Sequence, residues 1–558
     1  MAVREYVGAR YVPKFMGEYS PTTAYEALSV VDDGLGTSYT SKIPVPPGTP
    51  LTDTEYWALT GSLNGAILHL QDEIDDINDD IDDINNYKVI ATLPEAYGAI
   101  GDGIADDTAA IQDALDNNKL VYLPNKTYRI TDTITVPDGV SLVGIGSILI
   151  DYTTEYDAIV LSGNNTLKGI SFSDTGSSYI KSYSAVTAIQ TENIDICYCK
   201  FNDIHLGYAI RIEYSKHINV CNNSIDEYSY AGIVFASTCK YITVNKNSVI
   251  NGNFVDSGHN RYPICVSAYG DISTNHGPAE FVECNYNYIS DDSAIWEGID
   301  SHGVINAEFV GNTIIGTTFG ISLTKPTSAG SLTKNGWNVS IRDNYIEHDE
   351  AAWGSPYGKT AIGVNVEFDL YNLTIDNNYC NMVTDSGVTQ ISTGTHEIVV
   401  SASDASAYMN NIKITNNYIH QKGGGISITS INVAQGIEIS NNRITGLGLG
   451  TSSVAINLHD VTKSYSDIRI MGNYILASHS DAYSFRGNTT NEAHRMIKYK
   501  DNTDNGKYLE DKHCLCAKSS YTTSNNEGEN GDFIPCSVTG TTIGWFCQTR
   551  GTWKAITV

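Results

Sequence analysis

The residues best suited to chemistry lie together in one short acidic segment. Asp291 and Asp292 are followed closely by Trp296-Glu297-Gly298-Ile299-Asp300-Ser301-His302-Gly303. Glycoside hydrolysis uses a pair of carboxyl groups, one as acid and one as base or nucleophile. We therefore predict Glu297, Asp300 and a carboxylate from Asp291 or Asp292 as catalytic groups, with His302 orienting one of them. Trp296, beside these carboxylates, suits the face of a sugar ring. The alternative is a capped turn in which Asp300 and His302 only bond the backbone.

A second set of candidates lies in an insertion just upstream, from residue 251 to residue 280. It contains Asp256, His259, Arg261, Tyr262, Asp271 and His276. We predict that His259, Arg261 and Tyr262 bind substrate. Elimination from a uronic acid needs a base and a positive group that neutralises the substrate carboxylate. Because this region has few cations, hydrolysis is favoured over lyase chemistry. No metal ion or other cofactor is expected.

These residues must be positioned by a repeat that fills most of the chain. The pattern apolar-x-apolar-x-x-Asn-x-apolar recurs nine times, and the smallest interval, from Asn223 to Asn247, is 24 residues. The copies begin at Ile218, Ile242, Val282, Ala307, Val339, Leu373, Ile412, Ile437 and Ile468, and a tenth, from Ile194 to Phe201, has Cys199 at the Asn position. One such unit cannot bury its apolar face alone, whereas stacked units can.

The repeat predicts a parallel β-helix, in which Asn is structural and tolerates the bend that starts the next strand. An antiparallel sandwich is the alternative, but it would show hairpin turns and no fixed register. A further strand precedes many copies, at 209–212, 232–235, 320–323, 425–428 and 455–458, with its middle residue facing outward. In that register Asp300 takes the position of Arg211, Ser322, Ser427 and Asn457. Since neighbouring coils lie about 4.8 Å apart, Glu297 or Asp292 is expected near Asp300.

Two other modules precede the repeat. Residues 1–62 are rich in Tyr, Pro and Thr, and their aromatics, among them Tyr25, Tyr39 and Trp57, either contact sugar or form a small core. In residues 63–86, Leu63, Ile67, Leu70, Ile74, Ile77, Ile81 and Ile84 keep an unbroken heptad spacing. Ile at both core positions favours three or four strands, so we predict a homotrimeric coiled-coil stalk. This spacing argues against a disordered acidic linker, and the missing glycine loop argues against a calcium site.

Composition restricts the partners. The net charge of −30 and the lack of a basic run argue against nucleic-acid binding. No apolar stretch reaches the roughly 18 residues of a membrane span, and residues 1–12 lack the apolar core of a secretory signal, so synthesis in a cytoplasm is expected. The 11 cysteines suggest buried thiols rather than a disulfide framework. His513, Cys514, Cys516, Cys536 and Cys547 lack the paired spacing of common zinc sites, which favours buried thiols there too.

The opening of the repeat carries a more specific motif. Gly98, Gly101-Asp102-Gly103, Asp106-Asp107-Thr108 and Ile111-Gln112 predict a glycine turn, an N-cap among 106–108 and a helix with Ile111 and Leu115 on one face. Such a helix can cover the open end of a β-helix. The motif resembles the opening segment of the pectate-lyase-like β-helix of phage tailspikes and bacterial polysaccharide-degrading enzymes, and the resemblance spans about 97 to 480.

That resemblance implies an all-β, right-handed parallel β-helix over 87–490 and a C-terminal β-rich module over 491–558 that clamps the trimer or touches a receptor. Residues 1–62 resemble the N-terminal module of phage tail proteins, and parts of them resemble a chitin-binding-type module. The order of modules implies a homotrimeric phage tailspike, located in the virion tail and attached to tail or baseplate proteins. Its implied partner is a host capsule or cell-wall polysaccharide, which it binds and depolymerises. A glycan-binding fibre without activity is the alternative, and the missing signal disfavours a secreted pectinase.

Overall fold

The computed structural model describes residues 13–35, 37–62, 91–151, 156–177, 180–236, 238–252, 261–268, 278–324, 338–349, 360–366, 369–383, 396–402, 407–420, 424–430, 433–447, 454–461, 464–477, 483–489, 497–500 and 502–504, and five short segments after them. The chain divides into two compact units, Met1–Ile90 and Ala91–Val558. The predicted stalk, residues 63–86, lies outside the described residues. No described helix is both long enough and apolar enough to cross a membrane.

The first unit is a four-stranded sheet in the order β1 (Lys14–Glu18), β2 (Ser29–Asp32), β3 (Thr37–Ser41) and β4 (Trp57–Ser62). β1 and β2 are parallel and the other pairs are antiparallel. Tyr25 and Trp57 are buried with Val31 and Val45, and Tyr39 packs against them. Of the two uses considered for these aromatics, the structure shows a small core.

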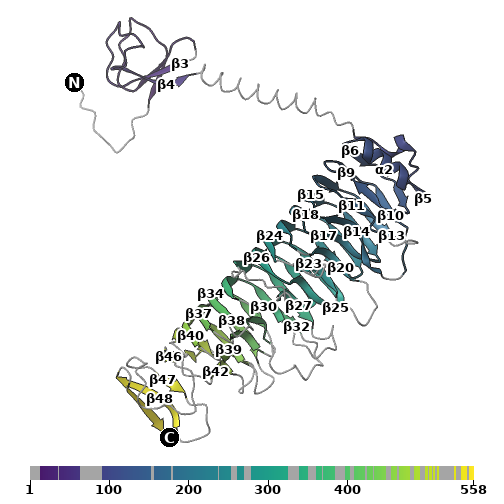
Figure 1. Cartoon of the computed structure of the whole chain (residues 1–558). Helices are drawn as coiled ribbons and strands as arrows, with labels where there is room; N and C mark the ends of the chain where they lie inside the picture. The colour runs from purple at the N-terminus through teal and green to yellow at the C-terminus, as the bar shows by residue number, and fades with distance from the viewer. Residues whose placement is uncertain are drawn as a thin grey trace. The chain divides into compact units, whose positions relative to one another are not determined.

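The second unit is a parallel β-helix whose strands stack coil upon coil into three sheets (Figure 1). Sheet I consists of β6 (Leu120–Leu123), β9 (Ser141–Gly144), β12 (Asn165–Lys168), β15 (Glu192–Cys197), β18 (Lys216–Cys221), β21 (Lys240–Asn245), β24 (Ala279–Asn285), β26 (Val304–Val310), β28 (Val339–Arg342), β31 (Leu370–Asp376), β34 (Tyr408–Thr415), β37 (Val433–Ser440), β40 (Ser464–Met471) and β43 (Ile497–Lys500).

Sheets II and III share the two long strands β25 (Tyr288–Ser301) and β27 (Thr313–Leu323), which start in sheet II and end in sheet III. Sheet II also contains β5 (Asp102–Asp106), β7 (Thr127–Ile130), β10 (Ser147–Ile150), β13 (Ser171–Asp174), β16 (Lys200–Ile204), β19 (Ser224–Tyr228), β22 (Ser248–Ile250), β29 (Tyr345–Asp349), β32 (Tyr379–Val383), β35 (Tyr418–His420), β38 (Arg443–Leu447), β41 (Tyr474–Ala477) and β44 (Thr503–Asp504). Sheet III also contains β8 (Ile134–Val136), β11 (Ile159–Leu161), β14 (Ile180–Ile189), β17 (Leu206–Glu213), β20 (Ala231–Ala236), β23 (Tyr262–Ala268), β30 (Thr360–Val366), β33 (Ile398–Ala402), β36 (Gly424–Ser430), β39 (Val454–Val461) and β42 (Tyr483–Thr489).

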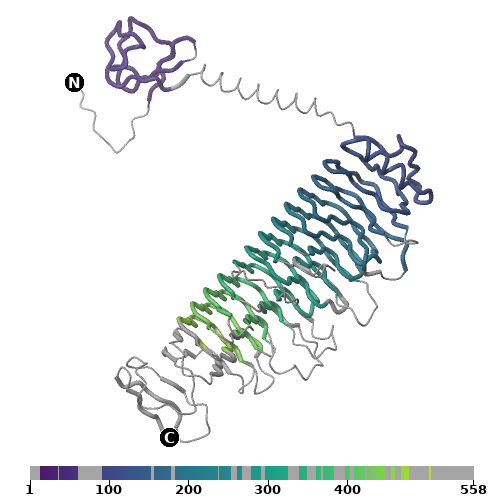
Figure 2. Tube along the Cα trace, viewed as in Figure 1, coloured from purple at the N-terminus to yellow at the C-terminus, as the bar shows by residue number. Residues whose placement is uncertain are grey.

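The backbone trace in Figure 2 follows these coils from the N-terminal end of the unit onward. Inward-facing Ile, Val, Leu and Phe from all three sheets form one continuous core. The five predicted strands that precede the Asn motif lie in β17, β20, β27, β36 and β39, as expected. After the last coil come β45 (Lys507–Tyr508), β46 (Lys512–Cys514), β47 (Phe533–Pro535), β48 (Thr542–Thr549) and β49 (Thr552–Thr557). The side chains of these strands lie outside the described part, as do those of the five residues weighed for zinc.

The predicted asparagines form a buried ladder in the turns between sheets I and II. From Asn247 onward, each Asn side chain accepts the backbone N–H and the side-chain N–H of the asparagine one coil earlier, whereas Asn223 accepts the backbone N–H of Cys199. For Asn378 these donors come from Asn344, at 3.1 and 2.9 Å, and its own Nδ2 donates to the Ile341 carbonyl at 2.9 Å. The ladder continues one rung beyond the predicted copies, to Asn502.

The bend itself is one residue earlier than predicted. From Asn223 to Asn473, the residue before each ladder position adopts the left-handed conformation, as Asn222 (φ 54°), Lys246 (φ 58°) and Asn377 (φ 52°) show. The ladder asparagines are held in place by hydrogen bonds instead. Such buried amides need partners for all their polar atoms, and stacked identical residues supply them.

The first coil is closed by α2 (Thr108–Asn117), which follows the short 3-10 helix η1 (Pro94–Tyr97). Ile111 and Leu115 are fully buried, as predicted. Asp107 is the N-cap residue, but its carboxylate accepts the backbone N–H groups of Ile100 and Gly101, at 2.6 and 3.0 Å, and not those of the helix. The motif aspartates therefore shape the turn that leads into the solenoid.

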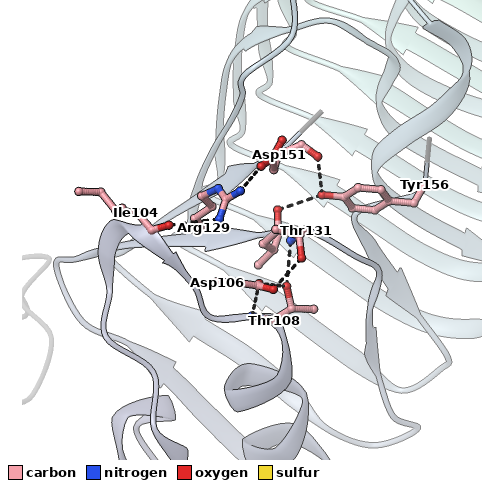
Figure 3. Close-up of polar contacts among 8 residues, drawn as sticks. Ile104, Asp106, Thr108, Arg129, Thr131, Asp151 and Tyr156 are labelled. Carbon is pink, nitrogen blue, oxygen red and sulfur yellow. Dashed lines mark hydrogen bonds and ion pairs between the residues drawn. The ribbon is translucent and has the colours of Figure 1, made fainter. Parts of the chain in front are cut away.

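Polar contacts bind this turn to the next coil (Figure 3). Asp106 accepts hydrogen bonds from the hydroxyls of Thr108 and Thr131, at 2.5 and 2.7 Å. Arg129 donates to the Ile104 carbonyl and pairs with Asp151. The Tyr156 hydroxyl lies 3.0 Å from the carbonyl oxygens of Ile130 and Asp151. All of these groups find partners within the cap, so the cluster serves the fold.

The expectation of no disulfide is wrong for one pair of cysteines. Cys197 and Cys221 form a disulfide, with Cα atoms 4.8 Å apart. They face outward from β15 and β18 and are direct register partners. Their separation of 24 residues is one coil, which places equivalent positions side by side. Cys199, Cys239, Cys265, Cys284 and Cys380 are free, buried thiols.

Replacing a ladder asparagine should destabilise the solenoid far more than replacing a half-buried asparagine on the outer face of sheet I. Asn378→Ala leaves two Asn344 donors and the Ile341 carbonyl without partners, which should cost about 3 kcal/mol or more. Asn219→Ala, on the outer face of β18, removes one hydrogen bond to Asp195 and should change stability by less than about 1 kcal/mol. Urea unfolding followed by circular dichroism measures both. Equal losses in the two variants would contradict a structural ladder.

Candidate active site

The candidate site lies on the outer face of sheet III, where β25 passes between β23 and β27. Asp300 pairs in register with Cys265 on one side and Ser322 on the other. The same outward row continues through Ser427 and Asn457, as the sequence predicts. Arg211 lies in this row three coils earlier. The register therefore fixes which side chains can touch Asp300.

Asp300 is buried, with 1% of its surface exposed. Its Oδ2 atom accepts a hydrogen bond from the Cys265 thiol at 3.0 Å and lies 3.3 Å from His302 Nε2. His302 Nδ1 is 3.1 Å from the Thr324 hydroxyl, which fixes the ring. The Asp300 Oδ1 atom is buried and has no hydrogen-bond partner within the described structure. A buried carboxylate oxygen left without a donor is costly, and a ligand group or water can satisfy it.

Glu297 completes the site from the same strand and is 6% exposed. Burial and the neighbouring Asp300 carboxylate raise the pKa of Glu297 well above its usual range, while a hydrogen bond to Ser322 acts in the opposite direction. Two neighbouring buried carboxyl groups cannot both lose their protons without a large cost in free energy. Glu297 therefore keeps its proton at a pH where an exposed glutamate has lost it, which is the state of a general acid.

Two groups of aromatic side chains lie near the pair. Trp296 is half-buried, with its ring centroid 5.2 Å from that of Phe319 in an edge-on arrangement. Tyr230 lies between Tyr208 and Tyr262, with ring centroids 5.7 and 5.5 Å away. Burial and the nearby Asp300 and Glu297 carboxylates are among the causes that raise the pKa of Tyr230. Tyr230 thus remains a neutral hydroxyl beside the acids.

The structure brings together only part of the predicted set. Glu297, Asp300 and His302 meet, and Tyr262 joins the aromatic group near them. The Arg261 guanidinium is bound to the Gly252 carbonyl. The side chains of Asp291 and Asp292 and the whole of His259 lie outside the described part of the chain. Among the residues that the structure describes, no three His, Cys, Asp or Glu side chains are grouped to hold a metal ion.

Cys265, Ser322 and Tyr230 were missed as site residues. Cys265 and Ser322 are one coil before and after Asp300, so the strand register alone could have named them. Tyr230 has no such signal, because it stands in the turn before β20. Another acid, Asp157, lies nearer the N-terminal end, where burial raises its pKa and the Ser184 N–H donates to it at 2.8 Å. Arg211 and Glu213 form an ion pair beside it.

Comparison with known proteins places the fold. Residues 95–281 match the family model described as rhamnogalacturonase A/epimerase, pectate lyase-like. The solenoid is a pectate-lyase-like parallel β-helix. The matched segment ends before β25, so it does not reach Glu297 or Asp300. The chain is 33% identical over 110 residues to a capsule K30/K69-specific depolymerase of Klebsiella phage K64-1, which covers 19% of this chain and 13% of that protein.

A glucan 1,3-beta-glucosidase of Cochliobolus carbonum is 43% identical over 51 residues, 8% of this chain and 6% of that protein. The chain thus spans less than a fifth of the length of either relative. Among solved structures, the Streptococcus pneumoniae adhesin PfbA has 15% identity and a TM-score of 0.45, over 84% of this chain and 98% of that one. Gene product 12 of bacteriophage phi29, in its pre-mature form, has 13% identity and a TM-score of 0.45, over 82% and 63%.

The raised pKa of Glu297 predicts how the stability of the folded protein depends on pH. The folded state binds a proton that the unfolded chain releases near pH 4.5, so stability falls as pH rises from there through the raised pKa. The loss is about 1.4 kcal/mol for each pH unit in that window. Glu297→Gln keeps the shape of the protonated acid, so the variant should lose less stability than the wild type between pH 5 and pH 8.

Chemical denaturation at the two pH values measures this difference. Glu283→Gln, an exposed carboxylate of β24, is the matched control and should follow the wild type. A Glu297→Gln variant that is clearly less stable than the wild type at pH 8 would show that Glu297 is ionised and favourably paired.

Proposed function

We propose that this protein binds and hydrolyses a surface polysaccharide on the outer face of sheet III. The observation that carries the proposal is the buried pair of Glu297 and Asp300, of which Glu297 holds a proton. Glycoside hydrolysis needs this division between an acid and a carboxylate. The stretch of identity to a phage capsule depolymerase and the match to a pectate-lyase-like family support a polysaccharide as the substrate class.

In this mechanism Glu297 donates its proton to the glycosidic oxygen as the bond from that oxygen to the anomeric carbon breaks. Asp300 acts as base or nucleophile and stabilises the positive charge that develops on the sugar ring. When Asp300 acts as base, it takes a proton from the water that adds to the anomeric carbon. When Asp300 acts as nucleophile, it forms an ester with the anomeric carbon, and water, deprotonated by Glu297, then cleaves that ester and releases the Asp300 carboxylate. His302, beside Asp300 Oδ2 and fixed by Thr324, orients that carboxylate. Trp296 provides an aromatic surface for the substrate.

The biological setting that we infer is a phage or prophage tail. In this setting the chain assembles as a homotrimer through the heptad segment 63–86, and residues 1–62 attach to other tail proteins. The polysaccharide is then a capsule or cell-wall component of the host. The predicted homotrimer and the tail attachment rest on the sequence pattern and on the resemblance to tail proteins.

Substitution of either carboxylate tests the chemistry. Glu297→Gln and Asp300→Asn should each lower the turnover of a cleaved polysaccharide by about 100-fold or more, because each removes a proton-transfer group or the charge that assists it. Glu55→Gln, which changes an exposed carboxylate of the first unit, should retain wild-type turnover. The wild-type rate should fall at high pH, as Glu297 loses its proton. Mass spectrometry of products from a panel of host polysaccharides measures this.

The product masses separate the possibilities. Saturated fragments that have gained one water per cleavage agree with hydrolysis, whereas unsaturated uronates would show a lyase. A polysaccharide that binds the wild type and stays intact would replace the proposal by a glycan-binding fibre. Full activity in both carboxylate variants would remove Glu297 and Asp300 from the reaction.

A further inference from the structure

A groove lies on the outer face of sheet I, away from the strands that carry Glu297 and Asp300. It has a volume of about 740 Å³ and is lined by strands of six successive coils, from β18 to β31, and the residues just before them. Its floor is a register row that includes Thr243, Glu283, Glu308 and Ser340. All of the lining residues lie in the described part of the chain.

One edge of the groove is a ridge of stacked aromatic rings, His217, Tyr241 and Phe281. Successive ring centroids are 4.7 and 4.9 Å apart, and the rings are nearly parallel, with interplanar angles of 2° and 6°. Tyr241 is 47% exposed and Phe281 is 43% exposed. The ridge therefore presents apolar ring edges to solvent, once per coil.

The fold does not require aromatics at this position. In the next coils the same edge consists of Asn306, Asn338 and Asn372, whose side chains bond one another at 2.7 and 2.8 Å. The aromatic residues have left-handed backbones, with φ of 57°, 55° and 58°. Asparagine adopts that conformation more readily than an aromatic residue does. The aromatic half of the edge therefore carries residues that fit the left-handed backbone less well than asparagine does. We take this as a sign that the aromatic rings contact another molecule.

The charges of the groove select the kind of contact. Glu283 and Glu308 are exposed in the floor, the lining contains no Lys or Arg, and Arg342, just outside the lining, lies 3.7 Å from Glu308. An anionic polysaccharide would be repelled both by these carboxylates and by the net charge of −30. A neutral sugar chain can place C–H groups on ring edges and donate hydroxyl protons to the carboxylates. A linear glycan along the solenoid axis would meet one such set of groups about every 4.8 Å.

We propose that this groove binds a linear, uncharged polysaccharide segment and holds the polymer on a face that performs no chemistry. The site does not depend on Glu297 or Asp300. It would keep a long polymer attached while its cleavage proceeds on sheet III, and it would serve a purely glycan-binding protein equally well.

The test replaces the aromatic edge by the asparagine edge that the chain already uses. The double variant Tyr241→Asn and Phe281→Asn suits the left-handed backbone and extends the row of hydrogen-bonded side chains formed by Asn306, Asn338 and Asn372. Tyr198→Asn is the matched control, because Tyr198 is also left-handed (φ 60°) and 55% exposed but lies outside the groove. All variants are made in the full chain carrying Glu297→Gln, so that no probe is consumed.

The probes are neutral hexasaccharides of β-1,4-linked glucose and of β-1,4-linked N-acetylglucosamine, with a hexagalacturonate as the anionic comparison. Isothermal titration and saturation-transfer NMR measure binding. At least one neutral probe should bind and the galacturonate should not. The double variant should bind the neutral probe about tenfold more weakly or not at all, with unchanged thermal unfolding, and Tyr198→Asn should bind normally.

Three results would overturn the proposal. The first is that neither neutral hexasaccharide binds. The second is that the double variant binds as tightly as its parent. The third is that the double variant changes oligomeric state in sedimentation velocity while its glycan binding stays the same. That result would make this face a contact between copies of the chain.

Discussion

The solenoid depends on the exact repetition of one buried hydrogen-bond pattern. Each ladder asparagine satisfies two donors of the coil before it, and its own Nδ2 satisfies a carbonyl of the strand that leads into that turn. A shift of one residue in any coil would leave all of these groups unpaired in an apolar interior, at several kcal/mol. The ladder therefore fixes the axial register of every strand that enters or leaves the turn. Insertions are tolerated elsewhere in a coil because they do not alter this turn.

Fixed register turns sequence positions into rows of touching side chains. On sheet III, the row that contains Asp300 passes from Arg211 through a valine and a cysteine to Ser322. Among the described residues of this row, Asp300 lies between Cys265 and Ser322, with no Lys or Arg beside it, and His302 Nε2 lies 3.3 Å away. Glu297 then meets the Asp300 charge in a place that excludes water, and its pKa rises. The acid property of Glu297 is thus a consequence of which residues the register places beside it.

Much of this architecture could be predicted from periodicity, because a parallel β-helix repeats the same contacts. The Asn pattern gave the coil boundaries, and the phase of the preceding strand gave the outward row of Asp300. The left-handed residue before each ladder Asn was missed because any of several residue types occupies it, including Lys246 and Tyr286. The Cys197–Cys221 disulfide was missed because cysteines were judged by burial alone and not by their spacing of one coil. Glu297 was expected near Asp300 from the spacing of neighbouring coils, whereas both residues lie on the single strand β25, whose course at Gly298 periodicity does not specify.

The outer faces of sheets I and III differ because insertions enter the coils at different places. The long insertions of the sequence enter the coils on both sides of sheet III, so that face can vary its side chains and local shape without disturbing the ladder. Sheet I is flanked on one side by the ladder turn itself, which allows no insertion, and its outer surface stays regular over many coils. Because the loops beside sheet III can vary, this face can hold one unique site such as the buried pair of Glu297 and Asp300. A regular face can only present the same contact repeatedly along the axis, which matches a ligand that is itself a repeating chain.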